Sequence, residues 1–269
     1  MSNDLPDYEL YAIRYATRAA SRSDHFIGGD PHDGPMPMDY FMWAAVGPAQ
    51  SFVIDAGFTA EVAARRKREF LRCPVEALKL IGLDGDTVSD VILTHLHYDH
   101  VGNFHKFPVA RFHLQEREMG FVTGPYMRYP KFGHSFEIED VVGMVKLNFK
   151  GRVEQHSGAF DLAPDISLHH VGGHTPGLQI VRVMTKRGWV VLASDAAHYF
   201  EHMQKNRFFV TAFNLGDMID GYRTCERLAA SSDHIIPGHD PLVMKLYPAV
   251  SAPLEGVIVR LDVPPRAES

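Results

Sequence analysis

Residues 94–100 read THLHYDH, and the short apolar run before them, residues 90–94, predicts a strand that leads straight into the stretch. Within six positions it offers four side chains that can bind metals: His95, His97, Asp99 and His100. His95 and His97 alternate, so an extended backbone would point both imidazoles the same way. Imidazole and carboxylate are ligands of zinc, iron and manganese. Four ligands exceed what one metal usually takes from one segment, so the spacing favours two adjacent metals.

Three further motifs each place a metal-binding residue type just after a predicted strand. GGHTPG (172–177) contains His174, ASDAAH (193–198) contains Asp195, and PGHD (237–240) contains His239. Taken singly, such a histidine could be an ordinary loop residue, and such an aspartate could be a helix N-cap. In layered α/β folds, however, ligand sites lie beyond the strand ends. We therefore expect all four motifs to share one site.

The remaining pattern predicts alternating strands and helices. We expect strands over residues 8–17, 40–46, 51–57, 90–94, 109–114, 165–171, 177–185, 189–195 and 234–240. We expect helices after Thr59, near residue 74 and over 216–231, with irregular helical structure over 115–149. The length of 269 residues fits one α/β domain and no linker divides the chain, so we expect residues 1–269 to form a single domain.

Composition excludes several classes of function. Lys and Arg number 27 against 33 Asp and Glu, a net charge of −6, which predicts no nucleic-acid or membrane partner. The two cysteines, Cys73 and Cys225, rule out a disulfide framework. Neither a signal peptide nor an apolar run of ~18 residues is visible, so we expect a cytoplasmic protein.

In their order along residues 40–245, these motifs resemble the metal-binding motifs of the metallo-β-lactamase superfamily. FVIDAG (52–57) resembles its early strand–Asp–Gly element, with Asp55 supporting the metal loop. The resemblance implies an α/β fold, an αββα sandwich of two mixed β-sheets flanked by helices, with a dinuclear site. It implies that one metal is held by His95, His97 and His174, that the second is held by Asp99, His100 and His239, and that Asp195 bridges the two. We expect two divalent ions, zinc first, with iron, manganese and cobalt left open.

Such a site predicts hydrolysis of an ester-like bond. Two cations about 3.5–4 Å apart lower the pKa of a shared water toward ~7 and polarise a carbonyl. Asp99 is expected to serve catalysis as well as metal binding. Neither cysteine lies in a ligand motif, which makes hydrolysis of β-lactam antibiotics a weaker prediction.

Within the superfamily, the chain most resembles the N-acyl homoserine lactonase branch. Only 30 residues follow His239, which leaves no room for the C-terminal domain of glyoxalase II. The resemblance implies a metal-dependent lactonase with a role in quorum quenching. It would open an N-acyl homoserine lactone or a related small lactone with a metal-bridging hydroxide. We expect a small-molecule lactone as the partner, and a homo-oligomer stays open.

The chain departs from this branch beside the bridging aspartate. The branch carries a tyrosine three residues after it, whereas this chain has His198 there, followed by Tyr199. We expect at least one of the two to donate a hydrogen bond to substrate, and we favour His198 by position. The alternative is that both cap or pack beneath the following helix.

Other assignments remain open at this point. A dinuclear hydrolase could act on an aromatic-ring-derived lactone, a cyclic amide or a thioester. A di-iron electron-transfer module usually has a glutamate where His97 stands, and a purely structural metal site has no need of a bridging carboxylate. For the substrate pocket, we expect walls from the 24–39 loop and residues 118–135.

Overall fold

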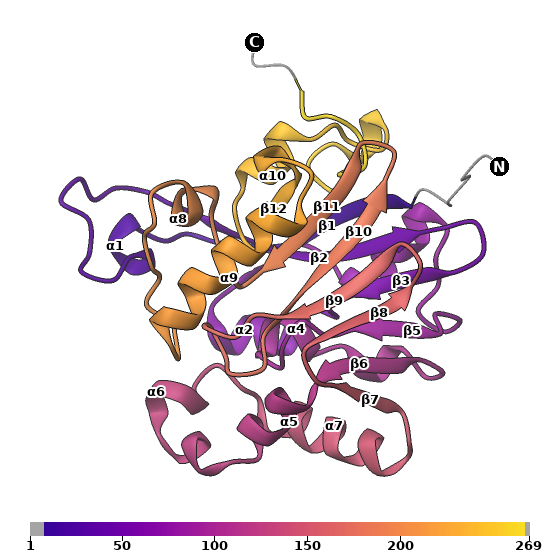
Figure 1. Cartoon of the computed structure of the whole chain (residues 1–269), viewed down its shortest axis with the longest axis horizontal. Helices are drawn as coiled ribbons and strands as arrows, with labels where there is room; N and C mark the ends of the chain where they lie inside the picture. Colours follow the sequence, from indigo (N-terminus) through magenta and orange to yellow (C-terminus); the bar gives the residue numbers. More distant parts are fainter. Residues whose placement is uncertain (1–7, 267–269) are drawn as a thin grey trace.

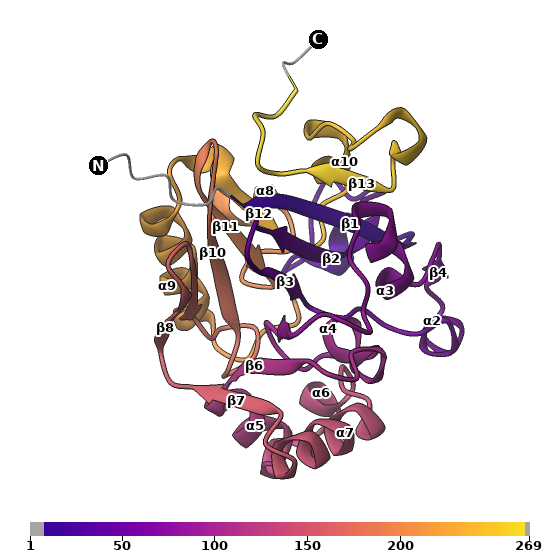
Figure 2. The same ribbon diagram turned by 90° about the vertical axis from the view of Figure 1, so that its right-hand side faces the viewer.

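Two β-sheets lie face to face and helices cover the outer face of each, as the two views in Figures 1 and 2 show. This is a computed structural model, and it describes residues 8–266. The first sheet has the strand order β13-β1-β2-β3-β5-β6-β7, with β4 paired to β1, and the second has the order β12-β11-β10-β9-β8. The chain is therefore the αββα sandwich that the family resemblance implies.

The strands of the first sheet are β1 (Glu9–Arg18), β2 (Met38–Val46), β3 (Ser51–Ile54), β4 (Glu69–Phe70), β5 (Asp90–Ile92), β6 (Arg111–Gln115), β7 (Val153–His156) and β13 (Ile258–Arg260). Those of the second are β8 (Ala159–Ala163), β9 (Ile166–His170), β10 (Gln179–Thr185), β11 (Gly188–Ser194) and β12 (Ile235–Pro237). Both sheets are mixed, because β3, β5, β6 and β7 pair in parallel, as do β11 and β12, while the other pairs are antiparallel.

The α-helices are α1 (Arg22–His25), α2 (Ala60–Arg66), α3 (Pro74–Ala77), α4 (Tyr98–Val101), α5 (Glu116–Val122), α6 (Pro130–Gly133), α7 (Ile138–Phe149), α8 (Phe200–Gln204), α9 (Leu215–Leu228) and α10 (Leu242–Leu246). Short 3₁₀ helices are η1 (Leu78–Ile81), η2 (Phe104–Lys106), η3 (Pro125–Arg128), η4 (Ser232–His234) and η5 (Ala252–Leu254). None of the helices in this described range is long and apolar enough to span a membrane.

Alternating side chains on the strands fill the layers. On β1, Leu10 and Ala12 face the space between the sheets, whereas Tyr11 and Ile13 face the helices outside the first sheet. On β11, Val190 and Leu192 likewise join the central layer, while Val191 and Ala193 pack against α9. Strands buried on both faces carry nearly continuous apolar sequences, which is why these runs were readable as strands.

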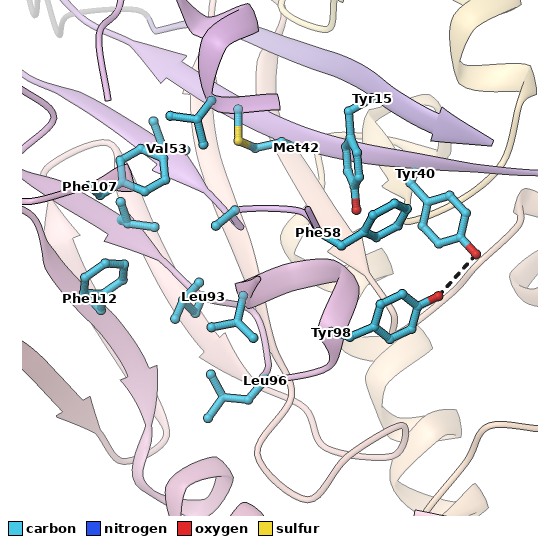
Figure 3. Close-up of a cluster of buried hydrophobic side chains, with 14 of the residues drawn as sticks. Tyr15, Tyr40, Met42, Val53, Phe58, Leu93, Leu96, Tyr98, Phe107 and Phe112 are labelled. Carbon is cyan, nitrogen blue, oxygen red and sulfur yellow. Dashed lines mark hydrogen bonds between the residues drawn. The ribbon is translucent and has the colours of Figure 1, made fainter. Parts of the chain in front are cut away.

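An aromatic cluster supports the loop that carries THLHYDH. Figure 3 shows Tyr15, Tyr40, Phe58 and Tyr98 together at one end of the outer core. The rings of Tyr15 and Phe58 meet edge to face at 4.9 Å between centroids, and the hydroxyls of Tyr40 and Tyr98 lie 3.4 Å apart. The Tyr15 hydroxyl donates to the backbone oxygen of Asp99 at 2.8 Å. Packing in the core thus fixes the position of this loop relative to the first sheet.

Most predicted strands are confirmed, but several elements were missed. β4, β7, β8 and β13 have no counterpart in the prediction, and β4 lies where the helix after Thr59 was expected to continue. The short helices α8 and α10 follow predicted strands and were not predicted. The helix after Thr59 is confirmed, with the Thr59 hydroxyl accepting from Val62 N at 3.3 Å. It ends at Arg66, earlier than its sequence pattern indicates, because Lys67 adopts a left-handed conformation with φ of 55°.

Candidate metal centre

Parallel strand pairing brings the four sequence motifs to one edge of the sandwich. β3 and β5 are parallel neighbours in the first sheet, and β11 and β12 are parallel neighbours in the second. Asp55 follows β3, THLHYDH follows β5, Asp195 follows β11 and His239 follows β12. The carboxyl ends of parallel strands meet at one edge, so these loops converge, and the loop between β9 and β10 adds His174.

Sharp backbone turns aim the side chains from these strand ends. Asp55 and Ser194 both have left-handed φ angles, 63° and 45°, immediately after their strands. Gly238 lies so close to this turn that a Cβ there would sit 2.7 Å from the Ser194 oxygen and 2.8 Å from Asp195 Oδ1. A hydrogen bond of 2.9 Å between the Thr94 and Ser194 hydroxyls joins the two sheets below the site. Loops from both sheets therefore hold the site in place.

The seven predicted ligands form two buried sets. His95, His97, His174 and Asp195 make one group in which candidate ligand atoms all lie within 4.8 Å of one another, and Asp99, His100 and His239 make a second. Asp195 faces both sets. Its Oδ1 lies 3.0 Å from His239 Nε2 and 3.4 Å from His100 Nε2, whereas its Oδ2 lies 3.2 Å from His174 Nε2. This division of its two oxygens is the arrangement that a bridging carboxylate needs.

Three imidazole rings are oriented by hydrogen bonds at Nδ1, the ring nitrogen that faces away from the ligand cluster. Nδ1 of His100 lies 2.7 Å from Asp55 Oδ2. Nδ1 of His174 donates to the Thr211 oxygen at 2.6 Å, and Nδ1 of His239 donates to the Asp39 oxygen at 2.8 Å. A proton on Nδ1 leaves Nε2 unprotonated and turned into the site, as metal-binding histidines require.

The donor set fits divalent cations. Within residues 8–266, His95 Nε2, His100 Nε2 and Asp195 Oδ1 are fully buried and lack a hydrogen-bond partner, although buried polar atoms are normally paired. All three point into the same cluster. Cations at this place would satisfy them. The ligands are imidazole nitrogens and carboxylate oxygens, a set that suits zinc, iron and manganese.

Electrostatics favour the protonation states that bind cations at Asp195, His95 and His97, whereas the carboxylates around His100 favour its protonated form when no cation is bound. Burial would raise the pKa of Asp195, but the imidazoles of His239 and His198 around it hold that pKa well below its usual range. Burial and neighbouring imidazoles lower the pKa values of His95 and His97. Burial also lowers the pKa of His100, yet Asp55 and two further carboxylates outweigh it and raise the pKa overall. Asp195 is thus anionic and several rings are neutral at pH 7.

His198 and Tyr199 take different positions. His198 is buried, its Nε2 lies 2.9 Å from Asp195 Oδ2, and its ring stacks on Phe209 at 3.7 Å between centroids. The Tyr199 hydroxyl instead contacts His25 Nε2 at 3.0 Å and donates to the Pro37 oxygen at 3.1 Å. Tyr199 also occupies the N-cap of α8. His198 therefore lies against Asp195, whereas the Tyr199 hydroxyl is bonded on the side of His25 and Pro37, and the expectation that one of them donates to substrate stays a prediction.

Side chains from residues 118–135 pack beside His97 and His174. A cavity of about 10 Å³ borders His97 and His174, which is room for about one water molecule. Phe121, Lys131 and Phe132 of the predicted 118–135 wall line it. The 24–39 loop does not line it. Pro35, Met36 and Pro37 instead border a separate groove next to Tyr199.

Sequence reasoning missed several residues that shape this site. They are Thr94, Glu118, Ser194, Phe209 and the backbone of Thr211. Four of them act through partners at least 22 positions away in the chain, and Phe209 stacks on His198, 11 positions away. No local pattern marks them as different from ordinary loop or helix residues.

Comparison with known families agrees with this geometry. A model of the metallo-beta-lactamase superfamily matches residues 38–246. The chain belongs to this superfamily. The sequence-based resemblance to this family is thereby confirmed, together with its fold.

The chain is also similar to two N-acyl homoserine lactonases along most of its length. The chain is 27% identical over 259 residues to N-acyl homoserine lactonase AttM of Azorhizobium caulinodans, covering 88% of this chain and 95% of the relative. The protein of the same name from Agrobacterium fabrum is 25% identical over the same shares of both chains. These similarities support the predicted lactonase-like branch.

Solved structures show the same fold. A quorum-quenching N-acyl homoserine lactone lactonase superposes with a TM-score of 0.74 at 18% identity, covering 89% of this chain and 95% of that one. AidC, a dizinc quorum-quenching lactonase in complex with a product, superposes with a TM-score of 0.70 at 14% identity, over 99% of this chain and all of that one.

Proposed function

We propose that the chain is a metal-dependent hydrolase that opens the ring of small lactones, with N-acyl homoserine lactones as the first substrates to test. The observation that carries this proposal is the placement of Asp195, whose two carboxylate oxygens face two separate sets of buried ligands. A site with two adjacent cations suits hydrolysis of an ester-like bond. The lactonases among its relatives support the substrate class.

Each predicted ligand has an assigned place in this proposal. One cation would be held by His95, His97 and His174, the second by Asp99, His100 and His239, with Asp195 between them. Zinc is our first assignment for both. When bound, such a pair supplies an activated water and a Lewis acid for the substrate carbonyl. That the chain forms one domain over residues 1–269 stays a prediction.

The chain's own residues hold and order this site. Asp55 orients His100, and the Asp39 and Thr211 oxygens orient His239 and His174. Burial of the cluster keeps bulk water away and strengthens each electrostatic contact. Asp99 borders the second set, with its Oδ2 3.9 Å from both His100 Nε2 and His239 Nε2. We assign it to cation binding and to catalysis together.

His198 is our proposed substrate donor. Its Nε2 lies 2.9 Å from Asp195 Oδ2, and Phe209 holds its ring in one plane. In this proposal the N–H of His198 exchanges its bond to Asp195 for one to the substrate. Losing one preorganised donor to a developing oxyanion costs roughly 10²–10³ in kcat. His198→Gln should therefore lower kcat by about this factor at full metal loading, whereas a loss of less than about threefold, far below that range, would remove His198 from the reaction.

The test of the function begins with metal content. Protein purified without chelator should contain two divalent ions per chain by elemental analysis, and Asp195→Asn should weaken binding of both. A chain that holds one ion and is fully active after reconstitution with excess metal would refute the dinuclear site.

Activity is tested on a panel read by the pH drop on hydrolysis. It contains acyl homoserine lactones, aromatic lactones, thioesters and phosphodiesters. Lactones should be cleaved fastest, chelation should abolish the activity, and label from solvent water should enter the product carboxylate. Turnover of thioesters alone, or a covalent acyl-enzyme, would refute the proposal.

A further inference from the structure

A buried glutamate joins the two loops that carry the first set of imidazoles. Glu118 is the third residue of α5, and its side chain is inaccessible to solvent. Its Oε1 accepts from Leu96 N at 3.0 Å. Its Oε2 accepts from the Thr175 hydroxyl at 2.6 Å and from Gly177 N at 3.1 Å. The two oxygens are thus divided between two loops.

Two of the three bonded positions, Leu96 and Thr175, are immediate neighbours of predicted ligands. Leu96 lies between His95 and His97, and Thr175 follows His174. The first loop extends from the first sheet, and the second connects β9 to β10 in the other sheet. Glu118 therefore connects the parts of both sheets that must hold one cation together, although it lies outside every candidate ligand group within the described residues.

Packing confirms that the contact is tight. Gly177 lies against the first turn of α5, and a Cβ at this position would overlap the Glu118 backbone. Nearby, Gln179 N donates to the Thr94 oxygen at 3.0 Å, and Gln179 Nε2 donates to the Leu93 oxygen at 2.8 Å. These bonds also join the two sheets, at the two residues that precede His95. Glu118 is the member of this junction whose acceptors reach the ligand loops directly.

A carboxylate has a specific advantage here. Burying it costs free energy, and burial raises its pKa to about 7. All three of its partners are donors, so it needs acceptors on both oxygens. A glutamine of the same shape has one acceptor, and its amide group would face a donor in one of the two loops. The choice of Glu118 therefore follows from the two loops it must hold.

We propose that Glu118 is a positioning residue that sets the spacing of His95 and His97 relative to His174 and so preorganises one of the two cation subsites. This inference rests on the proposed function, because it assumes a dinuclear site. Glu118 neither coordinates a cation nor contacts substrate. Its influence passes through the backbone of residue 96 and through Thr175.

The test compares Glu118→Gln with the wild type in metal binding. Stripped protein is titrated with Zn²⁺ against a chromophoric chelator, and the visible spectrum of the Co²⁺-loaded protein reports ligand geometry. Glu118→Gln should weaken one of the two cations by roughly 10–100-fold, as loss of an outer hydrogen-bond partner does, and should alter the Co²⁺ spectrum. The other cation should bind as in the wild type.

Asp90→Asn is the matched control. Asp90 is also buried and accepts from several partners, but it begins β5 at the end away from the site. Its loss should lower stability and leave both cation affinities unchanged. A general loss of stability would weaken metal binding in both variants alike, and that result would overturn the inference.

A second pair of variants keeps the test decisive if Glu118→Gln does not fold. Thr175→Val removes the shortest of the three bonds, while Thr175→Ser keeps the hydroxyl. The valine variant should lose affinity for the same single cation, and the serine variant should recover it. Unchanged affinities in folded Glu118→Gln or Thr175→Val, beside a wild type that binds two cations, refute this inference alone. A wild type that binds no second cation refutes the proposed function itself.

Discussion

Replacing Asp55 with asparagine tests how the second set of ligands is held. The Asp55 carboxylate is fully buried and accepts three hydrogen bonds, from Thr94 N at 2.7 Å, from the Thr94 hydroxyl at 2.9 Å and from His100 Nδ1 at 2.7 Å. Its backbone has a φ of 63°, a conformation that asparagine adopts about as readily as aspartate. Asp55→Asn therefore changes charge and bonding with little change in shape.

The size of the effect follows from these bonds. Asparagine has one side-chain acceptor oxygen, so if it bonds Thr94 N, its amide group faces the Nδ1 proton of His100. The lost bond is charge-assisted and is worth about 1.5–3 kcal/mol. Loss of such a partner typically weakens metal binding by roughly 10–100-fold, or about 1.4–2.7 kcal/mol. We expect this loss for the cation assigned to Asp99, His100 and His239.

The assay is a zinc titration of stripped protein against a competing chelator, combined with urea unfolding of the metal-free form. Asp90→Asn is again a close match, since Asp90 Oδ1 binds His113 Nε2 at 3.0 Å in a buried Asp–His pair of the same sheet. Both variants should lose stability, and only Asp55→Asn should lose zinc affinity. The reasoning fails if folded Asp55→Asn binds both cations within twofold of the wild type.

Three further predictions concern other parts of the molecule. Burial raises the pKa of Asp140 to about 6, so its contribution to stability is lost as the pH rises from about 4 to about 6. In metal-free protein, Asp140→Asn should therefore raise the free energy of unfolding by about 1–2 kcal/mol at pH 8 and leave it unchanged at pH 4. An equal gain at both pH values would contradict this. Tyr199→Phe should keep kcat within about threefold, far below the loss of an oxyanion donor, because its hydroxyl bonds His25 and Pro37, and a larger loss at full metal loading would contradict this. Phe213→Ala should speed removal of metal by a chelator, because Phe213 packs on Phe121 and Phe132, which line the cavity beside His97 and His174. An unchanged rate would contradict this.

The ligands could be predicted from sequence because each lies in a short motif at a strand end. THLHYDH carries four of them within six residues, and the apolar strands before Asp195 and His239 are easy to recognise. Parallel pairing then brings these ends together without further information. The strand-end motifs therefore predicted their own convergence, and the sandwich followed from their resemblance to the metallo-β-lactamase superfamily.

The residues that hold the ligands could not be predicted in the same way. Glu118 acts on Leu96, 22 positions away, and on Thr175, 57 positions away. A glutamate in the first turn of a helix is ordinary, because it interacts favourably with the helix dipole. Its role depends on which loops the tertiary fold brings to it. The same is true of Phe209, which meets His198 only through the path of the chain after α8.

The strands that were missed have a related cause. β7 and β8 have mixed or exposed side chains, and β8 lies at an edge with three exposed residues in five. Such strands need not alternate in hydrophobicity, because neither face is fully covered. β13 has three residues and is defined by its pairing with β1. Pairing, rather than local pattern, makes each of them a strand.

Different carboxylates contact the loops of the two sets, and Thr94 links Asp55 to the first set as well, because its hydroxyl lies 3.2 Å from His95 Nδ1. Asp55 supports the second set through His100, and Glu118 supports the loops of the first set. Below them, Asp55 accepts from Thr94, whose hydroxyl also meets Ser194, the residue before Asp195. Asp195, the proposed bridging carboxylate, thus follows a residue that contacts the support of the second set. Disturbing Glu118 should therefore affect one subsite, whereas disturbing the Thr94–Ser194 contact reaches both through Asp195.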